Sequence, residues 1–182
     1  MKRFLFGVIA FILVGCVPQQ SEVPSADSAM PKLASLPDLG LAPELTNETW
    51  LNVDSPLRIA DLHGKVVIVE MWTFGCINCK NVMPSLKEWH SKYAEQGLVI
   101  IGNHFPEFSY EADLDNLKKA VDDYGLEYPI AQDNNGDTWR AYKNHYWPTL
   151  YLIDKQGRIR YIHIGEGGYA ATQAAIQALL AE

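Results

Sequence analysis

The sequence predicts an α/β fold in which amphipathic helices cover a largely parallel sheet. Residues 66–69 form an unbroken, mostly β-branched apolar run, too short for a membrane span and typical of a buried central strand. The apolar residues after it recur at steps of four, three and four, as one face of a helix requires; they are Val82, Leu86, Trp89 and Tyr93. A strand at 98–102 and an amphipathic helix at 114–124 repeat the pattern. This alternation favours a parallel sheet with helical covers.

The first residues have the layout of a secretory signal. Lys2 and Arg3 precede an apolar run at 4–14, which is too short to span a bilayer comfortably. The run closes with Leu-Val-Gly-Cys, ending at Cys16, and resembles the lipobox of bacterial lipoproteins, in which the cysteine after the cleavage site is lipidated. We therefore expect residues 1–15 to be a signal peptide and Cys16 to be a lipid anchor. A chance cysteine at this position is the alternative.

The predicted lipid anchor indicates the location of the protein in the cell. Residues 16–37 are rich in Pro, Ser, Ala and Gln without an apolar period, which indicates a flexible, lipidated tether. We expect one folded domain at 38–182, outside the cytoplasm and attached to a membrane through Cys16, in the periplasm or at the cell surface. The net charge of −7 argues against a nucleic-acid partner.

A small N-terminal hairpin is predicted ahead of the central strand. Its two strands are expected at 49–52 and 57–59, with a turn between them. Pro56 cannot donate a ladder hydrogen bond, so we expect the hairpin at an edge of the sheet.

The sequence of the C-terminal half predicts the remaining strands of a mixed sheet and two further helices. Residues 149–153 and 158–164, joined by a turn at 154–157, form a second predicted hairpin. The other expected elements are a short strand at 129–131, a short helix at 137–143 and a closing helix at 170–180.

Cys76 and Cys79 lie at the junction between the central strand and the first helix. Free backbone N–H groups and the positive end of the helix dipole stabilise a thiolate at such a place. We predict Cys76, nearer the helix tip, as the nucleophile that attacks a substrate disulfide, and Cys79, one turn later, as the thiol that resolves the mixed disulfide. With Cys16 assigned to the anchor, these two cysteines remain as a pair.

Three alternatives to a redox-active pair stay open. The cysteines can be half of a zinc site, but the sequence has no second CxxC and no closely spaced His pair, so we expect no metal. They can form a purely structural disulfide, although so short a loop constrains the unfolded chain little. The third alternative is two reduced core cysteines.

Glu70 is a carboxylate inside the apolar strand, six residues before Cys76. A buried carboxyl group tends to stay protonated, so Glu70 is a candidate to pass a proton to or from Cys79 during exchange. The alternatives are that Glu70 faces solvent or pairs with Lys65 or Lys80.

Several motifs together resemble the thioredoxin superfamily. They are the strand, CxxC and helix at 66–93, Pro84, Trp147-Pro148-Thr149 and residues 152–157. Residues 72–79 and the stretch from Tyr146-Trp147-Pro148 through 165–167 are similar to the thioredoxin-like domain of DipZ/TlpA-type proteins. From about Thr46 onward, this resemblance implies a thioredoxin-like three-layer α/β/α fold and a thiol–disulfide oxidoreductase. Its redox-active disulfide, Cys76–Cys79, implies that no bound cofactor is needed.

The resemblance also assigns residues around the sulfurs. Pro148 matches the superfamily's cis-proline, which packs beside the disulfide, and the backbone at Trp147 would then pair with an extended substrate segment. Trp147 and Phe74 are implied as an apolar rim. An ordinary strand-entry proline and simple aromatic packing are the alternatives.

The implied substrates are disulfides of extracytoplasmic proteins. Because DipZ-type domains are fused to a membrane electron carrier that this sequence lacks, we expect a separate membrane electron donor of the CcdA/DsbD type. A second possible function is a peroxiredoxin-like thiol peroxidase with Cys76 as peroxidatic cysteine, since Thr73 precedes it by three residues. Against this, Val69 stands where that family has a proline. A non-catalytic thiol module is the third class.

Overall fold

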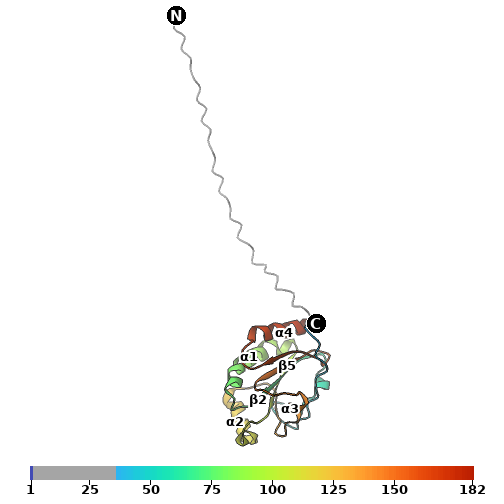
Figure 1. Cartoon of the computed structure of the whole chain (residues 1–182), viewed down its shortest axis with the longest axis vertical. Coiled ribbons are helices and arrows are strands. Elements are labelled where there is room, and N and C mark those ends of the chain that lie inside the picture. Colours follow the sequence, from blue (N-terminus) through green and yellow to red (C-terminus); the bar gives the residue numbers. More distant parts are fainter. Residues whose placement is uncertain (2–35) are drawn as a thin grey trace. The chain divides into compact units, whose positions relative to one another are not determined.

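The computed structural model describes Met1 and residues 36–182 (Figure 1). Cys16, the predicted signal peptide after Met1 and nearly all of the predicted tether lie outside the described residues. Within the described part, no helix is long and apolar enough to cross a membrane.

A six-stranded mixed sheet forms the centre of the domain, in the order β1-β4-β3-β2-β5-β6. The pairs β2–β3 and β3–β4 are parallel, and the pairs β1–β4, β2–β5 and β5–β6 are antiparallel. The strands are β1 (Thr49–Leu51), β2 (Val66–Trp72), β3 (Leu98–His104), β4 (Ile130–Gln132), β5 (Thr149–Ile153) and β6 (Ile159–Ile164). The predicted mixed sheet and C-terminal hairpin are confirmed.

Helices cover both faces of this sheet (Figure 1). The α-helices are α1 (Ile77–Tyr93), α2 (Leu114–Tyr124), α3 (Asp137–Ala141) and α4 (Tyr169–Ala181), and the 3₁₀ helices are η1 (Ile59–Leu62), η2 (Ala94–Gln96) and η3 (Ser109–Ala112). Residues of α1, α2 and α4 share a core cluster with Ile68 and Trp72 of β2. Residues of η1 and α3 pack with Val67 and Val69, which point to the opposite face. The predicted three-layer arrangement is therefore confirmed.

β2 is an interior strand, and all seven of its residues are buried. Its last residue, Trp72, is in register with His104 at the end of β3, and Met71 is in register with Thr149 at the start of β5. Three segments that are far apart in the sequence therefore meet at one edge of the sheet, where β2 leads into α1.

The predicted N-terminal hairpin is wrong. β1 pairs with β4 instead of with residues 57–59, and the chain forms η1 from Ile59 onward. The backbone N–H groups of Ile59 and Ala60 donate to the carboxylate of Glu44, so they are not available for a strand ladder. The short strand β4 gives β1 a different partner.

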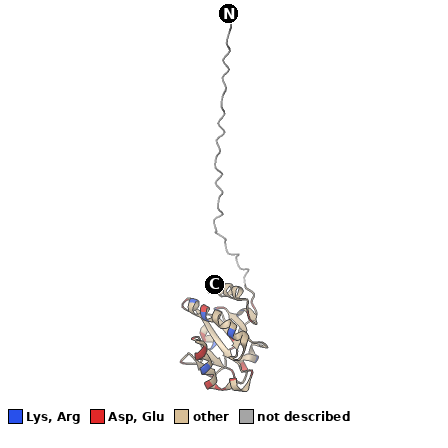
Figure 2. Ribbon diagram, turned by 90° about the vertical axis from the view of Figure 1, so that its left-hand side faces the viewer, with Lys and Arg blue, Asp and Glu red and all other residues tan. Residues whose placement is uncertain are grey.

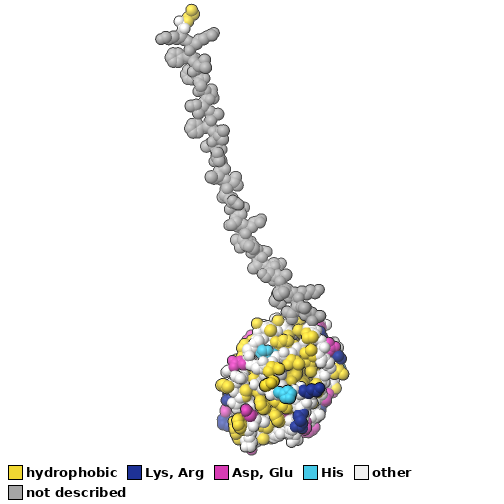
Figure 3. Space-filling view, in the orientation of Figure 1, with side chains coloured by type: hydrophobic (Ala, Val, Ile, Leu, Met, Phe, Trp, Pro, Cys, Tyr) yellow, Lys and Arg dark blue, Asp and Glu magenta, His cyan; other side chains and the backbone are white. Residues whose placement is uncertain are grey.

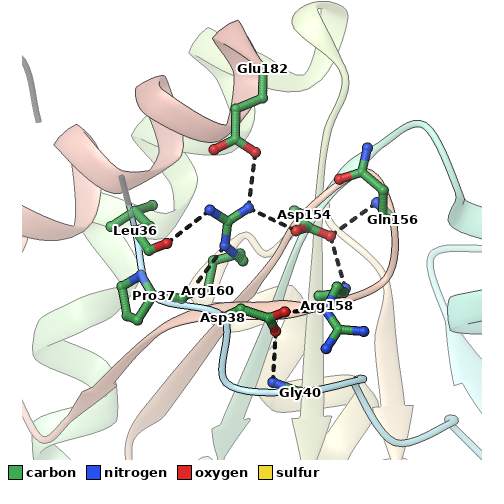
Figure 4. A network of polar contacts seen from close by, with 9 residues as sticks. All are labelled: Leu36, Pro37, Asp38, Gly40, Asp154, Gln156, Arg158, Arg160 and Glu182. Carbon is green, nitrogen blue, oxygen red and sulfur yellow. Dashed lines mark hydrogen bonds and ion pairs between the residues drawn. The ribbon is translucent and has the colours of Figure 1, made fainter. Parts of the chain in front are cut away.

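Arg160 of β6 joins the beginning and end of the described domain (Figure 4). Its guanidinium donates to the carbonyls of Leu36 and Pro37 at 2.9 and 3.0 Å, respectively, and pairs with Asp154 and Glu182 at 3.0 and 3.1 Å, respectively. These contacts hold Leu36 and Pro37 against β6 and the C-terminus.

The surface carries both signs of charge. Positions of Lys and Arg, in blue, and of Asp and Glu, in red, are both spread along the ribbon of the domain (Figure 2). Hydrophobic side chains occupy a large part of the face shown in Figure 3.

Candidate active site

Cys76 and Cys79 lie between the end of β2 and the first turn of α1. Cys76 is the N-cap residue of α1, and its Sγ accepts a hydrogen bond from the backbone N–H of Cys79 at 3.2 Å. The sulfur thus occupies the position where free N–H groups and the helix dipole stabilise a negative charge. Cys76 is half-buried and Cys79 is fully buried. Of the two sulfurs, Cys76 is the one that an incoming molecule can approach.

Cys79 is a thiol in an apolar environment. Both cysteines are in the free form. Burial, together with the nearby charge of Glu70, raises the pKa of the Cys79 thiol far above its ordinary value. Cys79 therefore needs a base before it can act as a nucleophile.

Glu70 lies on the face of β2 that is covered by α1, and it has no solvent exposure. Burial raises its pKa from 4.5 to about 8, despite a hydrogen bond that Tyr128 Oη donates to Oε2 at 3.4 Å. The other carboxyl oxygen, Oε1, has no partner among the described residues. The carboxyl group is thus mostly protonated at neutral pH, and the alternatives of a solvent-facing Glu70 or a pair with Lys65 or Lys80 are wrong.

Pro148 is buried directly before β5, and the peptide bond between Trp147 and Pro148 is cis. The carbonyl of Pro148 accepts from the backbone N–H of Gly165 at 2.8 Å. The backbone N–H and C=O of Trp147 form no hydrogen bond within residues 36–182. They are therefore available to a strand that approaches this edge.

Phe74 and Trp147 are half-buried and, like Cys76, pack against the larger core cluster. The Phe74 ring stacks on His104 with centroids 5.3 Å apart. Trp147 packs against Trp139 at 4.5 Å and stacks on Phe105 at 5.9 Å. Both predicted rim residues are therefore held in place by further aromatic rings.

His104 is a site residue that the sequence did not single out. It is buried at the end of β3, with Nε2 3.3 Å from the hydroxyl of Thr73. Burial lowers its pKa to about 4, so the ring is neutral at physiological pH. The available signal was its place at the end of a parallel strand, beside the end of β2.

Glu111 of η3 was also missed. It is fully buried, and its Oε1 accepts a hydrogen bond from the backbone N–H of Gly75 at 2.9 Å. Gly75 directly precedes Cys76, so this carboxylate lies behind the segment that carries the sulfur. No local pattern indicates a contact between residues 36 positions apart.

Metal ligands do not gather near the two cysteines. Over residues 36–182, no group of three or more His, Cys, Asp or Glu side chains is arranged to hold a metal ion. The polar groups of the site include two thiols, two carboxyl groups, a neutral imidazole and the hydroxyls of Thr73 and Tyr128.

Known proteins are similar to this chain over most of its length. The model of the AhpC/TSA family matches residues 40–162. Protein DipZ of Mycobacterium bovis is 42% identical over 150 residues, which cover 81% of this chain and 22% of DipZ. The chain thus spans about a fifth of the length of the DipZ proteins.

A shorter relative is matched over almost its full length. The thiol-disulfide oxidoreductase YkuV of Bacillus subtilis is 30% identical over 141 residues, which cover 77% of this chain and 94% of YkuV. Among solved structures, the thioredoxin-like superfamily protein SPOA0173 is similar with a TM-score of 0.71 and 31% identity, covering 79% of this chain and 97% of that one. The thioredoxin-like fold is therefore shared over 79% of this chain.

Proposed function

Since this chain belongs to the AhpC/TSA family, within the thioredoxin superfamily, we propose that it is a thiol–disulfide oxidoreductase that reduces or exchanges protein disulfides outside the cytoplasm through Cys76 and Cys79. The observation that carries the proposal is the half-buried Cys76 at the N-cap of α1, with buried Cys79 and Glu70 behind it.

The two sulfurs have different tasks in the proposed reaction. The Cys76 thiolate attacks one sulfur of the partner disulfide, and the other partner sulfur leaves as a thiolate. Cys79, once deprotonated, attacks Sγ of Cys76 and releases the second partner thiolate. The partner gains two electrons, and the chain is left with a Cys76–Cys79 disulfide. No bound cofactor takes part.

Glu70 acts as the proton carrier for Cys79. Its pKa of about 8 makes both the neutral and the ionised carboxyl accessible near neutral pH, as a group that accepts and returns a proton requires. Ionised Glu70 takes the proton of Cys79 in the resolving step. Protonated Glu70 returns it when the disulfide is reduced again.

The surface around Cys76 favours an extended protein segment as substrate. Ile77 next to Cys76 and Tyr146 next to Trp147 expose 66% and 60% of their surface, respectively. The free backbone groups of Trp147 offer strand pairing beside cis-Pro148, while Phe74 adds apolar contact. Main-chain pairing accepts many sequences, so the proposed substrates are a class and not one protein.

The cellular setting belongs to the same proposal. A lipid on Cys16 would hold the domain at the membrane, and the acidic net charge of −7 leaves the lipid as its main attachment. A membrane donor of the CcdA/DsbD type would then return electrons to the Cys76–Cys79 disulfide. Such a donor is needed because glutathione does not keep dithiols reduced outside the cytoplasm.

Paired cysteine variants test the proposed reaction. In insulin disulfide reduction, Cys76→Ser should lose about a hundredfold or more of the rate, because the attacking sulfur is gone. Cys79→Ser should accumulate a mixed disulfide with the partner, which is detectable by mass on a non-reducing gel. Undiminished exchange by Cys76→Ser would overturn the proposal.

Thiol peroxidase is the second candidate, because the AhpC/TSA family matches and Thr73 precedes Cys76 by three residues. In the structure, however, the Thr73 hydroxyl is buried and lies 3.3 Å from His104 Nε2. Direct peroxide turnover by the wild type, with formation of a sulfenic acid at Cys76, distinguishes this function from disulfide exchange.

A further inference from the structure

Glu111 is a buried carboxylate with an unusual set of partners. Its side chain has no exposed surface, and three backbone N–H groups donate to its two oxygens. Gly75 donates to Oε1 at 2.9 Å, and Glu107 and Phe108 donate to Oε2 at 2.6 and 3.0 Å, respectively. Three backbone donors thus converge on a carboxylate, which can only accept hydrogen bonds.

No basic side chain among residues 36–182 forms an ion pair with this carboxylate. None of the salt bridges between described residues involves Glu111. Its titratable neighbours are His104 at the end of β3, which burial keeps neutral, and Tyr110 in η3, whose Oη lies against Gly75. Lys80 of α1 lies over the ring of Tyr124. The site therefore contains a fixed negative charge one residue away from the nucleophile.

Gly75 fits this carboxylate closely. A Cβ atom at Gly75 would overlap Oε1 of Glu111 and lie 2.9 Å from the hydroxyl of Tyr110. The absence of a side chain thus lets the carboxylate reach the peptide N–H next to Cys76. The Phe74 ring packs against both His104 and Tyr110. These contacts also hold the backbone directly before Gly75 in place.

We propose that Glu111 is a positioning residue that holds the Gly75–Cys76 segment and makes the cysteine pair more reducing. The reduced pair carries negative charge when a thiolate is present and the disulfide carries none, so a negative charge nearby disfavours the reduced form. The charge therefore favours the disulfide over the dithiol, so the enzyme gives up electrons more readily. The inference rests on the proposed function, because Glu111 acts through Cys76.

The test compares Glu111→Gln with Glu107→Gln in the full chain. Both variants remove one negative charge from the same loop, but Glu107 is exposed and Glu111 is buried. For Glu111→Gln we expect a more positive reduction potential against glutathione. We also expect about a threefold or larger increase in the Cys76 thiolate fraction at pH 7, measured by absorbance at 240 nm. Glu107→Gln should match the wild type in both measurements.

Glu111→Asp is a second variant that tests the inference if Glu111→Gln does not fold. It keeps the charge but places it one methylene farther from Gly75, so its potential should shift in the same direction as that of Glu111→Gln and by less. A merely structural role would lower the melting temperature of these variants and leave the potential unchanged. A folded Glu111→Gln, or failing that a folded Glu111→Asp, with the wild-type potential overturns the inference.

The two proposals fail in different ways. The equilibrium with glutathione reports on the cysteine pair alone and needs no protein substrate. If Cys76→Ser abolishes insulin reduction while Glu111→Gln keeps the wild-type potential, only the role of Glu111 is wrong. If Cys76→Ser retains insulin reduction, the proposed function is wrong, whatever the potential of Glu111→Gln.

Discussion

At the residue scale, Glu70 shows how burial changes an ordinary carboxyl group into a candidate proton carrier. The cost of placing a charge in the core raises its pKa to about 8, while its single described hydrogen bond, from Tyr128, only partly offsets that cost. The same core raises the pKa of Cys79. Each group therefore prefers its neutral form, and one proton moved between them makes Cys79 a nucleophile.

The pKa of Glu70 predicts a pH dependence of stability. The folded-state value of about 8 lies above the ordinary value of 4.5, so between these pH values the folded chain binds one more proton than the unfolded chain. The contribution of Glu70 to stability is fully present below about pH 4.5 and is lost as the pH rises to about 8. Relative to Glu70→Gln, the wild-type free energy of unfolding should fall by about 3 to 5 kcal/mol over this window.

Denaturant unfolding of both proteins at several pH values measures this difference. The control is Glu88→Gln, an exposed carboxylate on α1, whose free energy of unfolding should run parallel to that of the wild type. Parallel pH curves for Glu70→Gln and the wild type would show that Glu70 is ionised in the folded protein.

The site residues that could be predicted from the sequence are those that belong to a local sequence pattern. Cys76 and Cys79 stand out by their spacing at a strand–helix junction, and Glu70 by its place in an apolar run. His104 and Glu111 become recognisable only when β2 and β3 lie side by side, because their partners Thr73 and Gly75 are more than thirty residues away. The buried polar contacts behind Cys76 are therefore tertiary information.

At the element scale, Arg160 of β6 stabilises the junction between the start of the domain and its C-terminus (Figure 4). Its side chain is 15% exposed, and that of its partner Asp154 is 3% exposed. In Arg160→Ala, Asp154 keeps its bonds from the backbone N–H groups of Gln156 and Arg158 but loses its counter-charge. We expect a loss of about 2 to 3 kcal/mol in the free energy of unfolding.

Arg158→Ala is the matched control, two residues before Arg160. Arg158 pairs with Asp38 at 2.7 Å, but the two side chains are 38% and 52% exposed, respectively. An exposed pair contributes little, so this variant should lose about 1 kcal/mol or less in urea unfolding. Equal losses for the two variants would mean that burial of the Arg160–Asp154 pair adds nothing.

The long elements were predictable because each has a strong period or a continuous apolar run. α2 spans Leu114–Tyr124, as predicted, and β5 spans Thr149–Ile153, as predicted. The prediction of the N-terminal hairpin was wrong because β1 has only three residues and pairs with the open edge of β4. Glu44, whose carboxylate binds the first N–H groups of η1, gave no sequence signal for that capping.

At the scale of the whole molecule, the proposed attachment and the proposed chemistry lie in different parts of the chain. Arg160 and Asp154 hold Leu36, the first described residue of the domain, at the β6 side of the sheet. Cys76 lies between the end of the interior strand β2 and the start of α1. A change at the N-terminal segment should therefore alter where the protein resides and leave the cysteine pair unchanged.

Cys16→Ser in the full chain tests this separation in a bacterial host. Without the thiol that would accept lipid, the chain should move from the membrane fraction to the soluble extracytoplasmic fraction, because the acidic domain has little affinity for anionic lipid. The purified variant should keep the wild-type rate of insulin reduction and the wild-type potential. Cys76→Ser is the converse control, with normal membrane association and no exchange. Membrane retention of Cys16→Ser would show that another segment or partner binds the protein there, and a changed potential would contradict the independence of the two ends.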